Sequence, residues 1–306
     1  MTPQDFDYLR KFLHERSGLV LSSEKQYLAE SRLLPVARRH GMTSLADLVG
    51  RVRSQPGSAF CIEVVEAMTT NETFFFRDKM PFEHFRDTVM PALIAARARD
   101  KRIRIWCAAA STGQEPYSLA MMLKEMEAKV AGYRIEILAT DLSGEVLERA
   151  KAGIYSQFEV QRGLPIHQLL RYFSQTGDSW QLAPELRSMV QYRTLNLLND
   201  FSPLGTFDVV FCRNVLIYFD QETKTGVFNR IARQVSDDGY LVLGAAETVV
   251  GLTDAFKPVT DKRGLYAPNA AARLAARSAT YAAQATASHP AAGGSLNGAR
   301  LNGFKR

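Results

Sequence analysis

The sequence predicts an all-α helical bundle followed by an α/β domain that carries a small antiparallel β insertion. In residues 1–70, apolar residues recur at helical spacing, with glycines where helices would stop. From residue 101 onward, strand-like patterns alternate with helical patterns, which is typical of βαβ units and a parallel sheet. After residue 152 this alternation is interrupted, and two short β-like runs flank the turn signal TGDS.

The N-terminal region, residues 1–70, contains four expected helices at 6–18, 23–41, 43–54 and 59–70. Phe6, Leu9 and Leu13 fall on one face of the first helix, and Gly18 and Gly41 are placed to end the first and second helices. We interpret this region as a receptor-docking helical domain, and residues 71–100 as a linker with a cofactor-contacting motif.

The α/β domain is expected to span residues 101–268, with its β insertion at about 170–190. Its candidate strands are 102–107, 134–141, 190–197, 207–212, 239–245 and 265–268, and its candidate helices are 116–130, 143–152 and 221–235. Residues 269–306 are mainly Ala, Gly, Ser and Asn with scattered Arg, which predicts a disordered basic tail.

Charge and composition argue against several function classes. The net charge is +6, but seven basic residues and no acidic ones follow Asp261, so residues 1–261 carry 6 − 7 = −1 and indicate no nucleic-acid partner. Three cysteines without a C-x-x-C pair and five scattered histidines predict buried thiols and no metal site. Without an apolar run of about 18 residues or an apolar N-terminus, we expect a cytoplasmic protein with no membrane span.

The stretch RIRIWCAAASTGQEPYSLAMMLKEM, residues 102–126, reads as a strand feeding a helix that begins at Pro116. A dinucleotide fold would place G-x-G-x-x-G between them, but this loop has one glycine, Gly113. Glu115 at the helix start is either a binding residue or a glutamate favoured by the helix dipole. Asp141, at the tip of the next strand, would either bind ribose hydroxyls or cap the following helix.

Together, these two carboxylates would repel a phosphate and attract a cationic or zwitterionic ligand. S-adenosylmethionine has an ammonium, a sulfonium and a ribose but no phosphate, so it fits this pattern.

Five motifs in one order resemble the chemotaxis receptor glutamate methyltransferases, the CheR family. They are NETFFFRD at 71–78, AAASTGQEPYSLAM at 108–121, ATDLS at 139–143, NLL at 196–198 and FDVVFCRNVLIYF at 207–219. The resemblance covers residues 1 to about 268 and implies a class I SAM-dependent methyltransferase (Rossmann-like) domain. It also implies methyl transfer from S-adenosylmethionine to glutamates on the cytoplasmic helices of chemoreceptors, which leaves S-adenosylhomocysteine. We expect a monomer; the alternative is a non-catalytic module that senses S-adenosylmethionine or binds receptors.

The resemblance also implies which residues form the site. Tyr218 matches a tyrosine proposed to lie beside the transferred methyl group; without the resemblance, a half-buried core tyrosine would be the better interpretation. The positions that match the family's cofactor contacts are Asn71, Thr73, Arg77, Glu115, Asp141, Asn196, Leu197, Arg213 and Asn214.

Alternation along NETFFFRD gives a more local expectation. In an extended stretch, Asn71, Thr73 and Arg77 would point to one side, with the Arg77 guanidinium available to the methionine carboxylate of the cofactor. Phe74 and Phe76 would point to the other side and pack.

A basic stretch of the bundle is the candidate docking surface for the substrate. Between residues 32 and 53 a single acidic residue, Asp47, stands against five arginines, which are Arg32, Arg38, Arg39, Arg51 and Arg53. Such a face would either steer a glutamate-rich receptor helix or simply be solvated. The insertion loop, within 172–185, looks shorter than in family members that tether to a receptor's C-terminal pentapeptide, so we expect pentapeptide-independent methylation.

Overall fold

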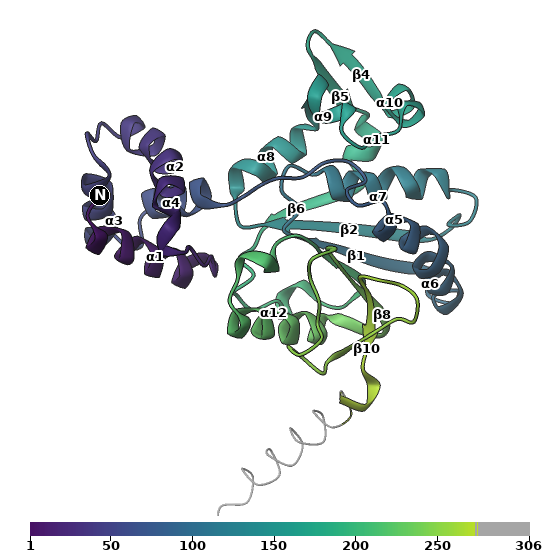
Figure 1. Ribbon diagram of the computed structural model, residues 1–306. Helices are drawn as coiled ribbons and strands as arrows, with labels where there is room; N and C mark the ends of the chain where they lie inside the picture. The colour runs from purple at the N-terminus through teal and green to yellow at the C-terminus, as the bar shows by residue number, and fades with distance from the viewer. Residues whose placement is uncertain (273, 275–306) are drawn as a thin grey trace, which may run out of the picture. The chain divides into compact units, whose positions relative to one another are not determined.

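The computed structural model describes residues 1–272 and 274, which form a helical bundle and an α/β domain (Figure 1). The predicted disordered tail, 269–306, lies outside the described residues apart from 269–272 and 274.

The predicted bundle is confirmed. Its helices are α1 (Pro3–Ser17), α2 (Gln26–Arg39), α3 (Leu45–Ser54) and α4 (Ala59–Met68). Leu9, Leu13 and Leu33 are fully buried between them. Gly18 ends α1 in the left-handed conformation, with φ 77°, as its position after the apolar pattern predicted.

Residues 80–96, which sequence analysis placed in a linker, are instead helical. They form α5 (Met80–His84), a π-helical turn (Phe85–Val89) and α6 (Met90–Ala96). Phe82, Phe85 and Leu93 are buried in the core of the α/β domain, on the same side of the sheet as α7. This segment therefore belongs to the layer that covers the sheet.

The main sheet has seven strands in the order β6-β2-β1-β7-β8-β10-β9. The first five strands in this order run parallel, and β10 and β9 are each antiparallel to their neighbours. Their bounds are β1 (Arg102–Ala108), β2 (Arg134–Asp141), β6 (Val190–Thr194), β7 (Phe207–Cys212), β8 (Val235–Leu243), β9 (Phe256–Pro258) and β10 (Leu265–Pro268). The order reverses between β1 and β7, which is where open α/β sheets bind ligands.

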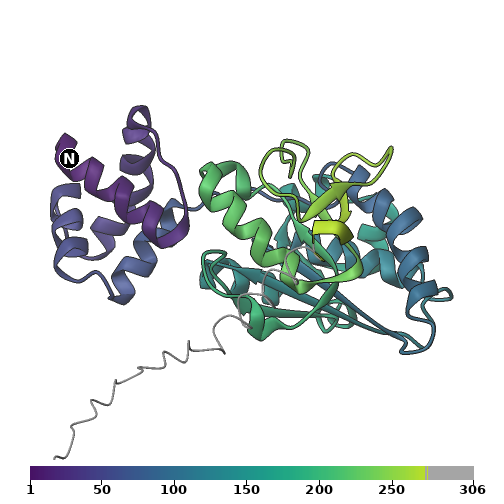
Figure 2. The ribbon, with the colours of Figure 1, turned by 90° about the horizontal axis from the view of Figure 1, so that it is seen from below.

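Helices cover both faces of this sheet. Helices α7 (Gln114–Glu125), α5 and α6 lie on one side, and α12 (Gln221–Gln234) lies on the other (Figures 1 and 2). β1 alternates accordingly: Ile105 and Cys107 belong to the core under α7, whereas Trp106 belongs to the core under α12. Helix α8 (Gly144–Ala152) follows β2. The three cysteines are buried free thiols, as predicted.

The β insertion is larger than predicted. The predicted hairpin is present as β4 (Phe173–Thr176) and β5 (Ser179–Leu182), joined by the two residues Gly177 and Asp178. A third strand, β3 (Ile154–Ser156), pairs with β5, so the sheet order is β3-β5-β4. Short helices α9 (Gln157–Gln161), α10 (Ile166–Tyr172) and α11 (Pro184–Arg187) complete this region.

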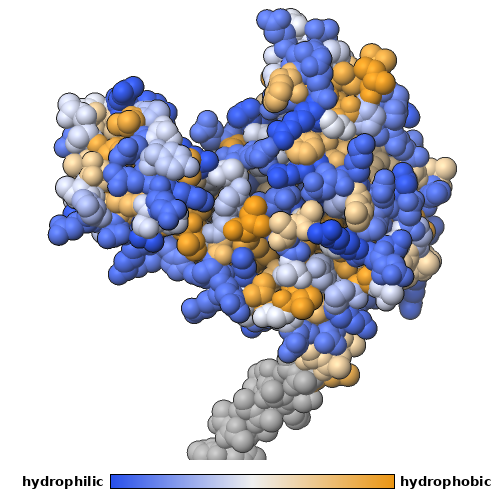
Figure 3. All heavy atoms as spheres, in the orientation of Figure 1, coloured by the Kyte–Doolittle hydropathy of each residue, from blue (hydrophilic) through white to orange (hydrophobic). Residues whose placement is uncertain are grey.

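Among the described residues, every helix falls short of the length and apolar character that a membrane span requires. The face seen in Figure 3 is mainly hydrophilic, with hydrophobic residues in small groups.

Arg32 has a structural role that differs from the docking role expected from the sequence. Its guanidinium donates to the carbonyl oxygens of Met68 (2.7 Å) and Thr69 (2.9 Å) and to Oγ1 of Thr70 (3.0 Å). These carbonyls lie at the C-terminal end of α4, which has no further helical turn to satisfy them. The Arg32 side chain therefore stabilises the segment that leaves the bundle after α4, whereas the side chain of Arg38 is exposed.

We predict that Arg32→Ala lowers the free energy of unfolding by about 1–3 kcal/mol, because it leaves polar groups at the end of α4 without their donor. The matched control, Arg38→Ala on the exposed side of the same helix, is expected to stay within about 0.5 kcal/mol of the wild type. Thermal and urea unfolding measure both variants. Equal stability of the two would contradict the structural role of Arg32.

Candidate functional site

The carboxyl ends of β1, β2, β6 and β7 meet at one edge of the sheet, and a pocket lies over this edge. Its walls come from the loops after these strands, from residues 69–77 and from the end of α1. All ten predicted cofactor-contacting and catalytic residues line it; they are Asn71, Thr73, Arg77, Glu115, Asp141, Asn196, Leu197, Arg213, Asn214 and Tyr218. The structure thus brings together residues that are up to 147 positions apart in the chain, since 218 − 71 = 147.

The loop between β1 and α7 uses its one glycine for packing. Gly113 has φ 93°, and a Cβ there would lie 2.9 Å from both the Ala150 Cβ and the Tyr192 hydroxyl. Ala109 and Ser111 also have positive φ, 61° and 51°, a conformation that costs free energy in non-glycine residues. Helix α7 begins at Gln114 rather than at the predicted Pro116, because Gly113 is its N-cap.

Asp141 binds this loop to the end of β2. Its Oδ2 accepts from the backbone N–H of Ser111 (2.8 Å) and its Oδ1 from that of Ser143 (3.0 Å). The N-cap of α8 is Ser143, whose hydroxyl accepts from Val146, so Asp141 is not the cap. Burial raises the pKa of Asp141, although the two backbone donors oppose the shift.

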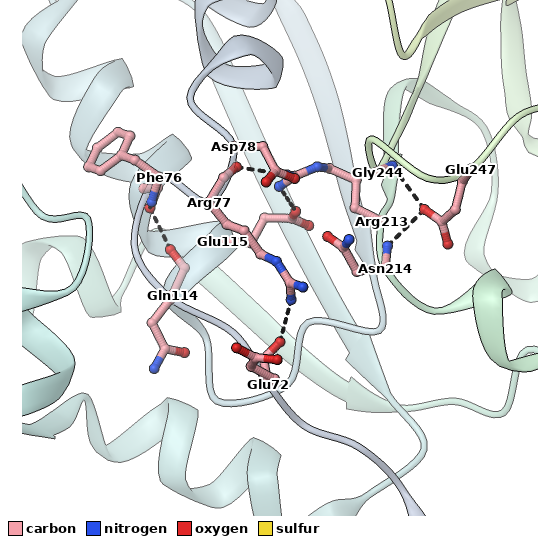
Figure 4. A network of polar contacts seen from close by, with 11 residues as sticks. Glu72, Phe76, Arg77, Asp78, Gln114, Glu115, Arg213, Asn214, Gly244 and Glu247 are labelled. Atoms are coloured by element: carbon pink, nitrogen blue, oxygen red, sulfur yellow. Dashed lines mark hydrogen bonds and ion pairs between the residues drawn. The ribbon is translucent and has the colours of Figure 1, made fainter.

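An ion-pair network centred on the buried Arg213 lies at the pocket (Figure 4). The side chain of Arg213, 2% exposed, lies 2.8 Å from Glu115 and 2.9 Å from Asp78, and it also donates to the Arg77 carbonyl (2.7 Å). Burial raises the pKa of Glu115, and Arg213 opposes this shift. Arg213 therefore faces the pocket as the partner of two carboxylates, and it joins the β7 loop to residues 77–78 and to α7.

Glu247, which no sequence pattern singled out, shapes the turn after β7. One of its carboxylate oxygens accepts from the backbone N–H groups of Asn214 (2.8 Å) and Gly244 (2.9 Å), as Figure 4 shows. The other accepts from those of Val215 (3.0 Å) and Leu216 (2.8 Å). Asn214 has φ 57°. The only signal in the sequence is an acid shortly after a buried strand, which is too common to single out a residue.

Residues 71–79 do not follow the extended alternation that we predicted. The chain turns at 75–78, and Phe76, Asp78 and Lys79 have positive φ. Phe75 is therefore the fully buried aromatic of this segment, whereas Phe74 and Phe76 are half-buried. A period of two requires continuous strand geometry, and a turn of this kind breaks it.

Arg77 still faces the pocket. Its Nη1 donates to the Glu72 carbonyl across the turn (2.5 Å), as Figure 4 shows.

The helical bundle contributes part of the pocket wall, which sequence analysis did not anticipate. Ser17 and Leu19, at the end of α1, line the pocket. Two contacts hold this end in place: the Asn196 side chain donates to the Arg16 carbonyl (2.6 Å), and the Val20 N–H donates to the Tyr218 carbonyl (2.9 Å). Tyr218 is half-buried, and its hydroxyl makes no hydrogen bond to another described residue.

The remaining predicted docking arginines differ in their surroundings. Arg39 pairs with Glu63 (2.6 Å), Arg51 stacks on Phe60 (4.3 Å to the ring centroid), and Arg53 reaches α1, where it pairs with Asp5 (3.4 Å). Arg38 is exposed, and its side chain has no hydrogen bond or ion pair with another described residue.

Comparison with known sequences identifies the family. Residues 4–69 match the family described as CheR methyltransferase, all-alpha domain, and residues 71–265 match CheR methyltransferase, SAM binding domain. The chain belongs to the CheR methyltransferase family.

Relatives with similar sequences align with most of this chain. The chain is 46% identical over 265 residues to chemotaxis protein methyltransferase 1 of Pseudomonas aeruginosa and 43% identical over 265 residues to chemotaxis protein methyltransferase Cher2 of Pseudomonas putida. These alignments cover 85% of this chain and 96% of each relative. The protein is a SAM-dependent chemotaxis protein methyltransferase.

The pocket residues suit S-adenosylmethionine. Each oxygen of Asp141 accepts one backbone N–H, and a carboxylate oxygen has capacity for a second donor, such as a ribose hydroxyl. Arg213 occupies one oxygen of Glu115, and three carboxylates, those of Glu72, Glu115 and Asp141, line the pocket together with two arginines, which suits a ligand with a cationic group. The pocket-lining loop has no run of glycines to admit a pyrophosphate.

We predict that Asp141→Ala weakens S-adenosylmethionine binding by about 2–4 kcal/mol, because two hydrogen bonds to a charged acceptor are lost. Ser143→Ala, which removes only the helix cap, should lower stability by about 1 kcal/mol and leave cofactor affinity unchanged. Calorimetric titration and thermal unfolding measure the two effects. An unchanged dissociation constant in Asp141→Ala would restrict this residue to holding the loop.

Proposed function

We propose that this enzyme transfers the methyl group of S-adenosylmethionine to glutamate side chains on the cytoplasmic helices of chemoreceptors, forming methyl esters. The observation that carries the proposal is the convergence of Asp141, Glu115 and Tyr218 on one pocket beside a helical bundle with exposed arginines. The relatives' names, which place them in chemotaxis, support it. We infer that the protein acts in the cytoplasm, where those helices lie.

The proposed chemistry needs little acid–base help. S-adenosylmethionine supplies a methyl group on a sulfonium, and a receptor glutamate is ionised at neutral pH and ready to attack. The protein's contribution is then alignment and exclusion of water. Tyr218, whose hydroxyl has no other partner among the described residues, would orient the acceptor carboxylate. Arg77 lines the same pocket and adds positive charge toward it.

The decisive experiment incubates the protein with methyl-labelled S-adenosylmethionine and receptor-containing membranes. We expect label in the receptor that is released by mild base, as a carboxyl methyl ester requires. Receptor with its methyl-accepting glutamates replaced by alanine should remain unlabelled. Cofactor binding without base-labile incorporation would refute the glutamate substrate.

Receptor docking is proposed to use the basic surface of α2. The face seen in Figure 3 is mainly hydrophilic, so a receptor helix would be recognised there by complementary charge rather than by a large apolar contact. The Arg38 side chain on this helix has no ion-pair partner in the described part of the chain, and Arg39 is mostly exposed although it pairs with Glu63.

We predict that Arg38→Glu together with Arg39→Glu lowers the kcat/KM for receptor about three- to tenfold at low salt, because like charges would then oppose an acidic helix. Cofactor affinity should not change. Arg99→Glu reverses an exposed arginine before β1, at the opposite end of the sheet strands, and serves as the control. Radiometric assays at low and high salt measure kcat/KM. An equal loss of kcat/KM in the Arg99→Glu control would contradict a specific docking role for the α2 arginines.

We also propose that methylation does not require the receptor's C-terminal pentapeptide. Capture of such a peptide by a small sheet adds a strand at an edge and needs pockets beside it. The connection next to edge strand β4 is only Gly177 and Asp178, and nothing lies within 4 Å of a Cβ built on Gly177. Two residues cannot fold over a bound strand.

Titration with a receptor-tail pentapeptide tests this proposal directly. We predict no saturable heat, while a family member that tethers should bind under the same conditions. Micromolar binding, about −8 kcal/mol, would contradict the argument from loop length.

A further inference from the structure

The β insertion contacts segments that form the cofactor pocket. Phe75, in the middle of residues 71–78, packs edge-on against Tyr155 of β3, with ring centroids 5.0 Å apart. It also packs edge-on against Phe173 of β4 at 5.6 Å. The single fully buried aromatic of the pocket segment is therefore held by the insertion and not by the main sheet alone.

A glycine permits an unusually close approach between the two segments. Gly163, which follows α9, has φ 83°, and a Cβ there would lie 2.1 Å from the Phe75 carbonyl oxygen and 3.1 Å from the Phe74 ring. No side chain can occupy that space without moving one of the two backbones. The insertion backbone at Gly163 thus packs directly against residues 74–75 and constrains their position.

A buried hydroxyl links the insertion to the loop after β1. The Tyr155 hydroxyl donates to the Thr112 carbonyl (2.9 Å), and both groups are buried. Thr112 directly follows Ser111, whose N–H donates to Asp141 and whose hydroxyl donates to the Asn71 carbonyl (2.9 Å). Tyr155 therefore supports the same loop that Asp141 holds through Ser111.

Arg162 adds a third contact. Its guanidinium pairs with the Glu72 carboxylate (2.6 Å) and lies over the Phe74 ring, 4.3 Å from the centroid. Arg77 lies near the same ring, at 5.6 Å. Residues on both sides of Thr73 are thus tied to the insertion.

We propose that the β insertion is a positioning element for the S-adenosylmethionine pocket, with Tyr155 and Gly163 as its positioning residues. It holds residues 72–75 and the carbonyl of Thr112, and through them the pocket-lining Thr73, Arg77 and Ser111. This role requires no ligand on the insertion, so it gives the insertion a purpose in an enzyme that does not use a tether. It rests on cofactor binding and methyl transfer, and it is independent of which residue accepts the methyl group.

The first test compares two glycines of the insertion that share a left-handed backbone. Gly163→Ala and Gly177→Ala both place an alanine at positive φ, 83° and 59°, but only the first adds an atom against the pocket segment. We expect Gly163→Ala to raise the calorimetric Kd for S-adenosylmethionine about five- to tenfold, and Gly177→Ala to stay within about twofold of the wild type. Equal Kd values in the two folded variants would overturn the proposal.

The second test compares two buried tyrosines, and it remains decisive if Gly163→Ala fails to fold. Tyr172, in α10, has a buried hydroxyl with no hydrogen-bond partner among the described residues. We expect Tyr155→Phe to raise the KM for S-adenosylmethionine about fivefold with the KM for receptor unchanged, and Tyr172→Phe to alter neither. A purely structural role would lower the melting temperature of Tyr155→Phe without changing the KM for cofactor, and that result would refute the inference.

Discussion

The cofactor pocket depends on one buried cation, the guanidinium of Arg213. It contacts Glu115 at the start of α7, Asp78 in the turn after Phe76, and the Arg77 carbonyl. Residues 71–79 form no strand or helix of their own, so side-chain contacts must hold them over the sheet edge. If the arginine is removed, Glu115 becomes a buried uncompensated charge, a change that typically costs about 3–5 kcal/mol.

The same arrangement explains why an all-α domain precedes the sheet. The end of α1 forms part of the pocket wall and is fixed by backbone contacts to Asn196 and Tyr218. The α4 carboxylate Glu66 accepts from the N–H of Gly144 at the start of α8 (2.7 Å), and His14 contacts Asp220 (2.6 Å). The bundle is therefore a structural part of the cofactor site, in addition to any docking role.

Much of the fold was predictable because burial imposes clear periodicity on strands and helices. The bounds of β2, β7 and β10 agree with the apolar runs, and Gly18 ends α1 where its pattern stops. Residues 80–96, predicted as a linker, are helical because their apolar side chains cover one face of the sheet.

Prediction was weaker where tertiary contacts override local pattern. Phe75, rather than Phe74 or Phe76, is buried because the chain turns, and Arg32 serves the end of α4 although it lies among exposed arginines. Glu247 acts through four backbone N–H groups from two loops, and no sequence pattern records such a contact. The resemblance located the pocket residues, whereas these supporting contacts required the structure.

The central claim is that the Arg213 network assembles the cofactor pocket, and a double-mutant cycle tests it most directly. The variants are Arg213→Met, Glu115→Gln and their combination, with S-adenosylmethionine affinity measured by calorimetry on folded protein. If the two side chains act as one unit, the losses will not add, and the coupling free energy will be at least about 1 kcal/mol. Additive losses would contradict the account and would assign the two residues separate roles at the pocket.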